Sequence, residues 1–339
     1  MKPTDFAYHL TNYLSKYLPG TCGLSKNTIS SYRDTFSLLL IFLRDKKGIK
    51  SEKVTLDHTT KSVALDFLEW IEEERGCSIT TRNQRLASIH AFFKYLQTET
   101  PEFIYQCQQI LSIKMKKAAS GMINFLSLDA IKTLLETPDS SSKKGRRDIV
   151  LLSLMYDTGA RVQEIADLCV SDIRLSTPAT VKITGKGEKT RIVPLQEPVR
   201  RLLQQYLQDN NIDEPMHKLY PLFRNKYQTK LTRAGITYIL KKHVESSRKK
   251  YPELFPNVVS PHCLRHSKAM HLRQSDVNLI YIRDLLGHVS IETTEIYAKT
   301  DSEMKRKALE KAAQKIIPSE QPKWHNNSDL LCWLKDLGK

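Results

Sequence analysis

The chain lacks the features that mark several common protein classes. Its six cysteines are scattered without a CxxC pair, which argues against a zinc ribbon or a disulfide scaffold and favours a reducing compartment. The first residues do not place an apolar run after a cationic segment, so no signal peptide is predicted. The longest apolar runs, such as residues 38–43, are far too short to cross a bilayer. We therefore expect a cytoplasmic protein without a membrane partner.

Glycine, proline and acidic residues are also scarce. With 12 Gly, 14 Pro and 40% hydrophobic residues in 339, the composition is that of a folded protein, long enough for two domains with separate cores. Lys and Arg number 53 against 37 Asp and Glu, which gives a formal charge of +16. Such an excess favours a polyanionic partner, of which nucleic acid is the commonest. Charge alone does not separate a nucleic-acid binder from a protein that is merely basic.

Three catalytic motifs are absent. The sequence has no GxxxxGK[ST] phosphate loop, no HExxH zinc motif and no GxSxG serine elbow. A pair of magnesium ions would need acidic residues where this chain has basic ones. His262 and His266, with His288 as a third ligand, are candidates for a metal site, but Arg265 between them is a poor neighbour for a divalent cation. We expect neither a metal nor a cofactor.

The first 111 residues carry apolar residues at helical spacing in four segments that are separated by short turns. This predicts a compact bundle of four or five helices. Polar and basic side chains near two of the helix starts suit contacts with DNA phosphates and grooves, although the same side chains also serve as ordinary helix caps. The candidate DNA-binding residues of the bundle are Lys26, Asn27, Thr28, Arg82, Asn83 and Arg85.

Residues 112–124 break the helical periodicity and predict a basic linker between two domains. Its lysines, Lys114, Lys116 and Lys117, extend the set of candidate DNA contacts. Beyond the linker most segments again read as helices, and Ser127 is a plausible N-cap. The alternating apolar residues around the sequence GKGEK at 185–189 predict a β-hairpin with a lysine at its tip. The fold class is therefore mainly α with a small β-sheet or hairpin.

One stretch, residues 260–299, concentrates the residues that carry chemistry. His262, Arg265 and His266 lie at the head of a predicted helix, His288 follows a glycine, and Tyr297 comes nine residues later. Guanidinium groups can clamp a phosphodiester and offset the charge of its transition state. A histidine or lysine can move a proton, and a phenol needs cationic neighbours because its ordinary pKa is about 10. These residues suit metal-free phosphoryl transfer that conserves the bond energy in a phosphotyrosine.

Five separated motifs resemble the tyrosine recombinase (integrase) family in order and spacing. They are TGARVQE with Arg161, GKGEKTR with Lys186, HCLRH at 262–266, LGH at 286–288, and Tyr297. The resemblance covers roughly residues 1–317. It implies a helical, SAM-like core-binding domain followed by an α+β catalytic domain. The implied boundaries are a core-binding domain at 1–111, a linker at 112–124, a catalytic domain at 125–300, a C-terminal exchange helix at 301–317, and a tail without an assigned role at 318–339.

The resemblance also implies roles for single residues. Tyr297 would attack the scissile phosphate and leave a 3′-phosphotyrosine, while Arg161 and Arg265 hold the phosphate. Lys186 would act as the general acid, and His262 would assist the tyrosine proton.

Three further residues complete the implied site. His288 would hydrogen-bond the phosphate, and Glu164 would support Arg161. His266 looks like a structural partner and is left out of the catalytic list.

Beyond single residues, the resemblance implies double-stranded DNA as the partner and a homotetramer that exchanges strands through a Holliday junction. The exchange helix would dock into a neighbouring protomer, although from the sequence it could equally pack in cis. The leading hypothesis is a site-specific recombinase of a mobile element, an integrase or transposase. The alternatives are a Xer-like resolvase of chromosome or plasmid dimers, a non-catalytic DNA-binding regulator, and a type IB topoisomerase.

Overall fold

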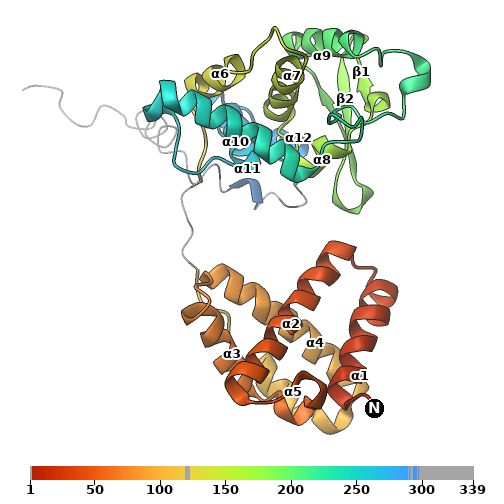
Figure 1. The fold of residues 1–339 in the computed structure, drawn as a ribbon, viewed down its shortest axis with the longest axis vertical. Helices are drawn as coiled ribbons and strands as arrows, with labels where there is room; N and C mark the ends of the chain where they lie inside the picture. The colour runs from red at the N-terminus through yellow and green to blue at the C-terminus, as the bar shows by residue number, and fades with distance from the viewer. Residues whose placement is uncertain (1, 119–122, 289, 291–292, 296, 298–339) are drawn as a thin grey trace, which may run out of the picture. The chain divides into compact units, whose positions relative to one another are not determined.

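The computed structural model describes residues 2–118, 123–288, 290, 293–295 and 297. The chain divides into two compact units, Met1–Gly121 and Met122–Lys339 (Figure 1), and each is described by itself. Within the described ranges no helix is both long and apolar enough to cross a membrane.

The first unit consists of helices and connecting loops, with no strand among its described residues. Side-chain oxygens of Thr4, Ser25, Thr60 and Ser78 accept hydrogen bonds from backbone N–H groups in the first turn of the helix that follows each of them. These caps satisfy donors that have no partner inside the helix, so they fix where the helices begin. The helices are α1 (Asp5–Asn12), which continues as a π-helical segment (Tyr13–Thr21), α2 (Lys26–Lys47), α3 (Lys61–Glu73), α4 (Ile79–Glu99) and α5 (Ile104–Leu111).

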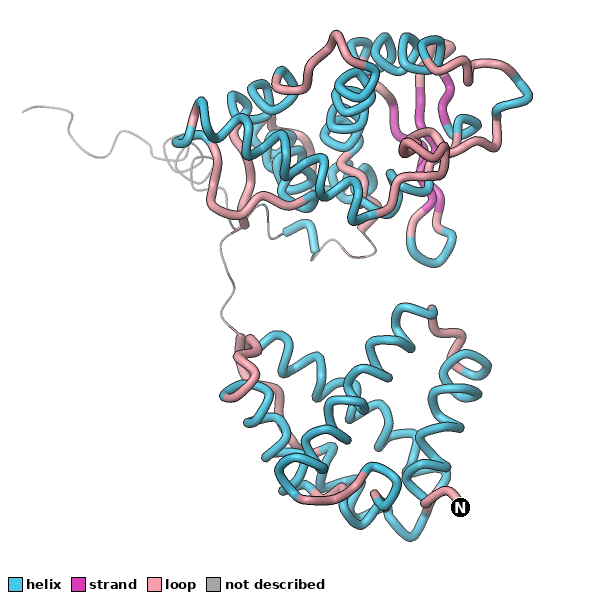
Figure 2. Tube along the Cα trace, viewed as in Figure 1, coloured by secondary structure: helices cyan, strands magenta, loops and turns pink. Residues whose placement is uncertain are grey.

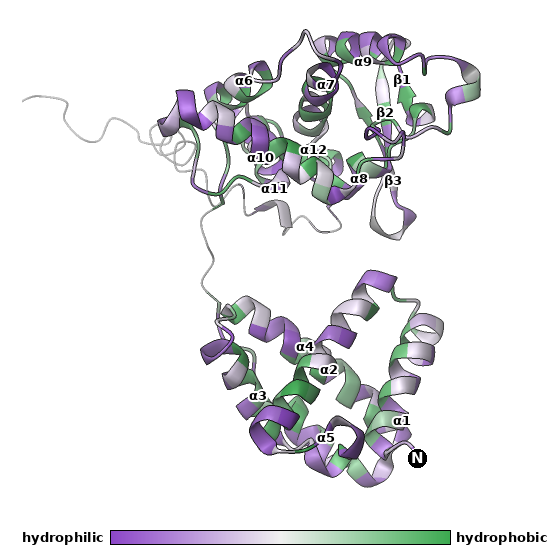
Figure 3. Cartoon of the chain, viewed as in Figure 1, coloured by the Kyte–Doolittle hydropathy of each residue, from purple (hydrophilic) through white to green (hydrophobic). Residues whose placement is uncertain are grey.

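Aromatic rings fill the core of the first unit. Phe92 on α4 is fully buried, and its ring meets those of Phe6, Tyr13 and Phe36 edge-on at centroid distances between 4.9 and 5.9 Å. Edge-to-face contacts of this kind add to the free energy gained from burying the rings. In Figure 3 the hydrophobic stretches of these helices gather where the helices meet. The contacts of Phe92 therefore join α1, the π-helical segment, α2 and α4 in one core.

The second unit is built from helices and one small sheet, which lies at one side of the unit (Figure 1). Its main apolar core includes Leu151, Ile165, Val181 and Leu240. A second, smaller apolar cluster contains Met270, Ile282, Leu286 and Tyr297. The elements are α6 (Leu128–Glu136), α7 (Lys143–Thr158), α8 (Val162–Asp167), β1 (Ile173–Arg174), β2 (Thr180–Thr184), β3 (Thr190–Pro194), α9 (Glu197–Asp209), α10 (Arg233–Lys250), α11 (Pro261–Gln274) and α12 (Leu279–Leu286).

The three strands form an antiparallel sheet in the order β1-β2-β3 (Figure 2). Val181 pairs with Val193 and Ile183 pairs with Arg191, so these four residues lie on the buried face. Ile192 points the other way and is exposed. The loop between β2 and β3 projects from the body of the unit (Figure 1).

The end of α7 is the point on which the candidate site is built. Gly159 ends this helix in the left-handed conformation, with φ of 58°. A Cβ at this position would lie 2.8 Å from the Leu286 side chain. Only glycine therefore allows the end of α12 to approach the end of α7 so closely.

The predicted fold class is confirmed, since the described residues are mostly helical with one small sheet. Ser127 caps α6 as expected. Arg161 is the N-cap of α8, which starts at Val162, and Asn278 caps α12. The predicted exchange helix at 301–317 and the tail at 318–339 lie outside the described residues.

Candidate active site

Arg161 and Glu164 form a compact pair at the start of α8. Glu164 Oε1 accepts a hydrogen bond from Arg161 Nη1 at 2.9 Å, and Oε2 accepts one from the Arg161 backbone N–H at 2.8 Å. The carboxylate is buried, whereas the Arg161 side chain keeps 38% of its surface exposed. Glu164 thus fixes one edge of the guanidinium and leaves the rest accessible to a ligand.

A second arginine, Arg191 on β3, binds the same carboxylate. Its Nη2 donates to Glu164 Oε2 at 2.7 Å and its Nη1 donates to Oε1 at 3.2 Å. Its Nε donates to the backbone oxygen of Leu285, near the end of α12, at 2.8 Å. Burial raises the pKa of Glu164, but the hydrogen bonds from Arg191 and Arg161 outweigh it, so the pKa lies below its usual value. Glu164 is therefore ionised at neutral pH.

Arg265 lies almost fully buried on α11 between two helix ends. Its Nη1 donates to the oxygen of Gly159 and its Nη2 donates to the oxygen of Leu286, both at 2.7 Å. Gly159 follows the last residue of α7 and Leu286 is the last residue of α12, so the cation sits at the negative ends of two helices. Burial, and then the charge of Arg161, lower the pKa of Arg265 to about 10, so it stays protonated at neutral pH.

Tyr297 is buried beside these arginines, with 1% of its surface exposed. Its hydroxyl lies 2.9 Å from His266 Nδ1 on α11. Burial raises the pKa of Tyr297, while the charges of Arg265 and Arg161 act to lower it. Burial, His262 and Arg265 lower the pKa of His266 to about 4, so the imidazole is neutral at pH 7. The neutral imidazole of His266 and the phenol of Tyr297 therefore share this hydrogen bond.

His288 also lies beside the phenol ring. Its ring lies nearly parallel to that of Tyr297, at 12° and a centroid distance of 6.5 Å. Its Nδ1 lies 2.9 Å from the Thr294 hydroxyl, which fixes the orientation of the imidazole. Burial, followed by Arg265, lowers the pKa of His288 to about 4. A neutral His288 is therefore held next to the phenol and the buried guanidinium.

The remaining two catalytic candidates lie on α11 and on the loop between β2 and β3. His262 is in the first turn of α11, and its ring centroid is 6.2 Å from that of His266. Loss of solvent, and then Arg265 and Arg161, lower the pKa of His262. Lys186 lies in the loop that joins β2 to β3. The structure thus brings Arg161, His262, Arg265, His288 and Tyr297 together. The loop that carries Lys186 joins two strands of the sheet, β2 and β3.

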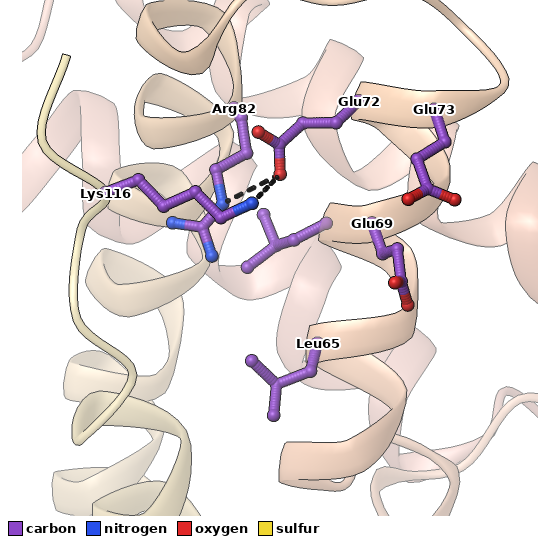
Figure 4. A pocket seen from close by; sticks show the side chains of 7 residues that line it. Leu65, Glu69, Glu72, Glu73, Arg82 and Lys116 are labelled. Atoms are coloured by element: carbon purple, nitrogen blue, oxygen red, sulfur yellow. Dashed lines mark hydrogen bonds and ion pairs between the residues drawn. The ribbon is translucent and has the colours of Figure 1, made fainter.

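The polar candidates of the first unit are placed differently from one another. Arg82 is buried, and its Nε lies 3.7 Å from Glu72 Oε2, which also binds Lys116 Nζ at 2.7 Å. The three side chains line a pocket of about 450 Å³ together with Leu65 and acidic residues of α3 (Figure 4). Glu72 therefore pairs with both the buried Arg82 and the exposed Lys116.

Asn83 and Arg85 also use their polar groups internally. Asn83 exchanges two hydrogen bonds with the backbone of Lys116, at 2.7 and 3.1 Å. Arg85 donates to the oxygen of Ser31 and to the hydroxyl of Thr35 on α2.

The other candidates of this unit are open to solvent to a greater degree. Lys26, Asn27, Lys114 and Lys117 are exposed, while Thr28 is partly buried and bonds the cap residue Ser25. Exposed groups at the start of α2 and in the basic linker are thus free for a polyanion, whereas Arg82, Asn83 and Arg85 hold the unit together.

The sequence did not predict the roles of two residues of the site, Arg191 and His266. Arg191 was not singled out, although the strand pattern carried a signal, because residues two apart share a face and Val193 is buried. His266 was set aside as a structural partner, yet it makes the hydrogen bond to Tyr297. His262, expected to assist the tyrosine, is one helical turn away from His266.

Comparison with known proteins agrees with this architecture. Residues 124–304 match the phage integrase family, and residues 11–100 match the N-terminal SAM-like domain of phage integrases. A putative integrase/recombinase of Sinorhizobium fredii is 34% identical over 313 residues, which cover 92% of each chain. The tyrosine recombinase XerD of Listeria monocytogenes is 31% identical over 277 residues, which cover 81% of this chain and 88% of XerD.

Solved structures with the same fold include two recombinase–DNA complexes. The post-cleavage complex of the XerH site-specific recombinase with its palindromic difH substrate matches with a TM-score of 0.66 and 23% identity, over 83% of this chain and 78% of that one. The integrase of the Tn1549 transposon, in complex with a circular intermediate DNA, matches with a TM-score of 0.68 and 16% identity, over 90% and 99%.

Proposed function

The chain belongs to the phage integrase family of tyrosine recombinases and is a site-specific recombinase, and from this premise we propose that Tyr297 is its nucleophile. One observation carries the assignment. The Tyr297 phenol is held at 2.9 Å by His266 and faces His288, and the charges of Arg265 and Arg161 act on it electrostatically. No other described tyrosine combines two imidazoles with two guanidiniums in this way.

In the proposed reaction the Tyr297 oxygen attacks the scissile phosphorus of DNA. The bond from phosphorus to the 5′ oxygen breaks, the phenol loses its proton, and the 5′ oxygen leaves after receiving one. Arg161 and Arg265 hold the non-bridging oxygens and offset the negative charge of the transition state. The product is a 3′-phosphotyrosine, which the 5′-hydroxyl of a second strand attacks in turn. The second step restores the phosphodiester and the free phenol without ATP.

We assign the proton transfers to residues around this centre. Lys186, on the loop between β2 and β3, is the general acid for the 5′ oxygen. His262 assists removal of the phenol proton, and His288 hydrogen-bonds the phosphate. His266 is added to this set as the group that orients the phenol, because it makes the hydrogen bond to Tyr297. Glu164 supports Arg161 through the two hydrogen bonds described above.

The proposed substrate is double-stranded DNA that carries specific recombination sites. The formal charge of +16 suits a polyanion, and exposed Lys26, Asn27, Lys114 and Lys117 offer contacts for it in the first unit. Relatives of the same fold are recombinases in complex with DNA, including XerH on its difH substrate and a lambda integrase dimer on a core site. A DNA substrate also favours the cytoplasm as the location.

We further propose that the active assembly is a homotetramer on two DNA sites. It exchanges strands in pairs through a Holliday junction, with residues 301–317 docked into a neighbouring protomer. Light scattering of the protein with its DNA site gives the stoichiometry, and deletion of residues 301–339 is expected to leave single-site binding while preventing synapsis. A complex that reaches the tetramer mass without these residues would contradict the docking proposal.

Two biological roles fit the family. A mobile-element integrase or transposase agrees with the 34% identity to the Sinorhizobium fredii integrase/recombinase. A resolvase of chromosome or plasmid dimers agrees with the 31% identity to XerD. Sequencing the DNA trapped on the protein in cells separates them, since an integrase is joined to element ends and a resolvase to a single chromosomal or plasmid site.

The direct test of the nucleophile uses a nicked DNA substrate that traps the covalent intermediate. Tyr297→Phe is expected to abolish the adduct on a denaturing gel while DNA binding stays nearly unchanged. Tyr281→Phe is the matched control, because Tyr281 on α12 is 70% exposed and is expected to leave the adduct intact. Mass spectrometry of the adduct identifies the attached residue. An adduct formed by Tyr297→Phe would mean that another side chain is the nucleophile.

A further inference from the structure

Arg191 is a charged residue on the buried face of a β-sheet. Its side chain is 13% exposed, and it faces Ile183 across the β2–β3 pair. A charge in such a place costs free energy unless hydrogen-bonded partners compensate it. Arg191 has these partners on two other elements: Glu164 on α8 and the backbone oxygen of Leu285 on α12. Its position is therefore set by parts of the chain that carry the proposed catalytic residues.

Glu164 is saturated by these contacts. Oε1 accepts from Arg161 Nη1 and Arg191 Nη1, and Oε2 accepts from the Arg161 backbone N–H and Arg191 Nη2. Two cations thus share one buried carboxylate. Arg191 takes both oxygens with its fork, so Arg161 is bound through a single guanidinium nitrogen.

Two glycines let the Glu164–Arg191 pair touch neighbouring loops. A Cβ on Gly185, next to Lys186, would lie 2.9 Å from Glu164 Oε1. A Cβ on Gly287, next to His288, would lie 2.9 Å from Arg191 Nη1. Both contacts are closer than a carbon atom tolerates, and the facing polar atoms are fixed by hydrogen bonds. The pair therefore sits directly against the backbone on which Lys186 and His288 are carried.

We propose that Arg191 is a positioning residue of strand cleavage: it neutralises and holds Glu164 so that the Arg161 guanidinium stays free for the scissile phosphate, and it anchors the Lys186 loop and the His288 turn to the same point. This inference rests on the proposed function. Arg191 acts through its neighbours and does not touch the reacting atoms in this assignment.

The physical reason is a competition for one carboxylate. Without Arg191, Glu164 keeps its negative charge in a buried place with Arg161 as its remaining side-chain donor. The carboxylate then draws the Arg161 guanidinium into a two-bond contact and neutralises it. A phosphate competes poorly for a guanidinium that is already paired, so the transition state loses stabilisation while binding of the DNA duplex, spread over many contacts, changes little.

The test measures single-turnover cleavage of the trapping substrate by Arg191→Ala and Arg191→Lys. Arg191→Ala is expected to slow cleavage about 100-fold, of the order seen when one transition-state donor is removed, with DNA affinity within about threefold. Arg191→Lys keeps the charge but loses the forked pair of donors, so its cleavage rate is expected to lie between those of the wild type and Arg191→Ala. If Arg191→Ala cleaves at the wild-type rate, the proposal is wrong.

A second substitution separates this role from simple loss of structure. Glu164→Gln removes the uncompensated charge, so the double variant with Arg191→Ala is expected to cleave at least about tenfold faster than Arg191→Ala alone. If Arg191 only supported the fold, the second change would add to the damage. A double variant that is as slow as Arg191→Ala, or slower, overturns the proposal.

The pH dependence gives an independent readout. The charged groups that face Glu164 among the described residues are Arg161 on α8, Arg191 on β3 and Arg265 on α11. Loss of the Arg191 hydrogen bonds raises the Glu164 pKa, so acidification neutralises the carboxylate earlier in the variant. The ratio of the Arg191→Ala rate to the wild-type rate is therefore expected to rise as the pH falls, within the range where both stay folded. A ratio that is constant or falls contradicts the proposal.

Arg200→Ala is the matched control. Arg200 on α9 also donates two hydrogen bonds of 2.7 Å to one glutamate, Glu197, but this pair lies at the surface. It is expected to cleave at the wild-type rate. If Arg191→Ala is too unstable to purify, Arg191→Lys and Gly185→Ala replace it, since an alanine at 185 displaces Glu164 from the other side. Wild-type rates in both overturn the proposal. The Tyr297-dependent adduct of the wild type is measured alongside, so failure of the proposed function is seen separately.

Discussion

The two units of the chain use arginine in different ways. In the first unit Arg82 and Arg85 bind acceptors of their own unit, Glu72, Ser31 and Thr35, and hold helices together. In the second unit Arg191 and Arg265 do the same for loops and helix ends, and they surround an arginine that is left only half paired, Arg161.

The difference concerns which charges a folded protein can leave available. A buried guanidinium must donate its hydrogen bonds to acceptors within the protein, so it stabilises the fold. An arginine that is to hold a phosphate must keep part of its surface exposed, but it must not move. Glu164 meets both conditions for Arg161, the proposed phosphate ligand, because it binds one nitrogen at 2.9 Å and leaves 38% of the side chain exposed. No residue among the N-terminal candidates is described in such an arrangement.

The strongest test of this contrast is Arg161→Ala. We expect strand cleavage to fall by at least about 100-fold, or about 3 kcal/mol of transition-state stabilisation, with little change in DNA affinity. Single-turnover cleavage and a binding titration measure the two quantities on one preparation. Normal cleavage by this variant would mean that Arg161 does not hold the phosphate, and the proposed difference between the two units would be wrong.

The counterpart in the first unit is Arg82→Ala. It removes the buried partner of Glu72, so we expect the unit to lose roughly 2–3 kcal/mol of stability, while the intrinsic cleavage rate of bound substrate stays the same. Hydrogen exchange of peptides from α3 and α4 reports the stability of this unit within the full chain. An unchanged exchange rate together with weaker DNA binding would instead make Arg82 a DNA contact.

Acidification is expected to weaken the second unit more than the first. The folded-state pKa of His266 and of His288 is lowered to about 4, below the ordinary value of about 6.5, so the unfolded chain binds more protons between these values. Stability therefore falls as the pH drops through this window, by up to about 2 kcal/mol for each of the two histidines at pH 5.

Hydrogen exchange of α11 peptides between pH 7 and 5, corrected for the intrinsic exchange rate, measures this loss. In the first unit the lowered pKa of His90 predicts a smaller change in the exchange of α4. His266→Gln is expected to remove part of the acid sensitivity of α11. Equal losses in both units would contradict the lowered pKa values of the two histidines beside Tyr297.

The smallest expected effect comes from Lys26→Ala at the start of α2. Lys26 is exposed, so its loss should leave stability and cleavage unchanged and weaken DNA binding by less than about tenfold. The slope of log affinity against log salt should decrease by about 1, as for one lost phosphate contact. An unchanged slope would mean that the start of α2 does not touch the DNA backbone.

The sequence was informative wherever chemistry restricts the order of residues. The helices, the hairpin and the grouping of Arg161, Arg265, His288 and Tyr297 follow from periodicity and from five motifs of the family. It was much less informative for the polar residues of the first unit. Serine-capped helix starts with basic neighbours look alike in sequence at Lys26 and at Arg82, although one side chain is exposed and the other is buried.

By itself the sequence determined the fold class and the family, and it predicted a set of candidate catalytic residues, because helix periods, caps and the order of motifs are local or strictly ordered features. Only the tertiary structure decided that His266 meets the Tyr297 hydroxyl, and that Arg191 and Arg161 share Glu164. Burial and hydrogen-bond partners are properties of residues far apart in the chain, and no spacing within one segment specifies which donor reaches a shared acceptor first.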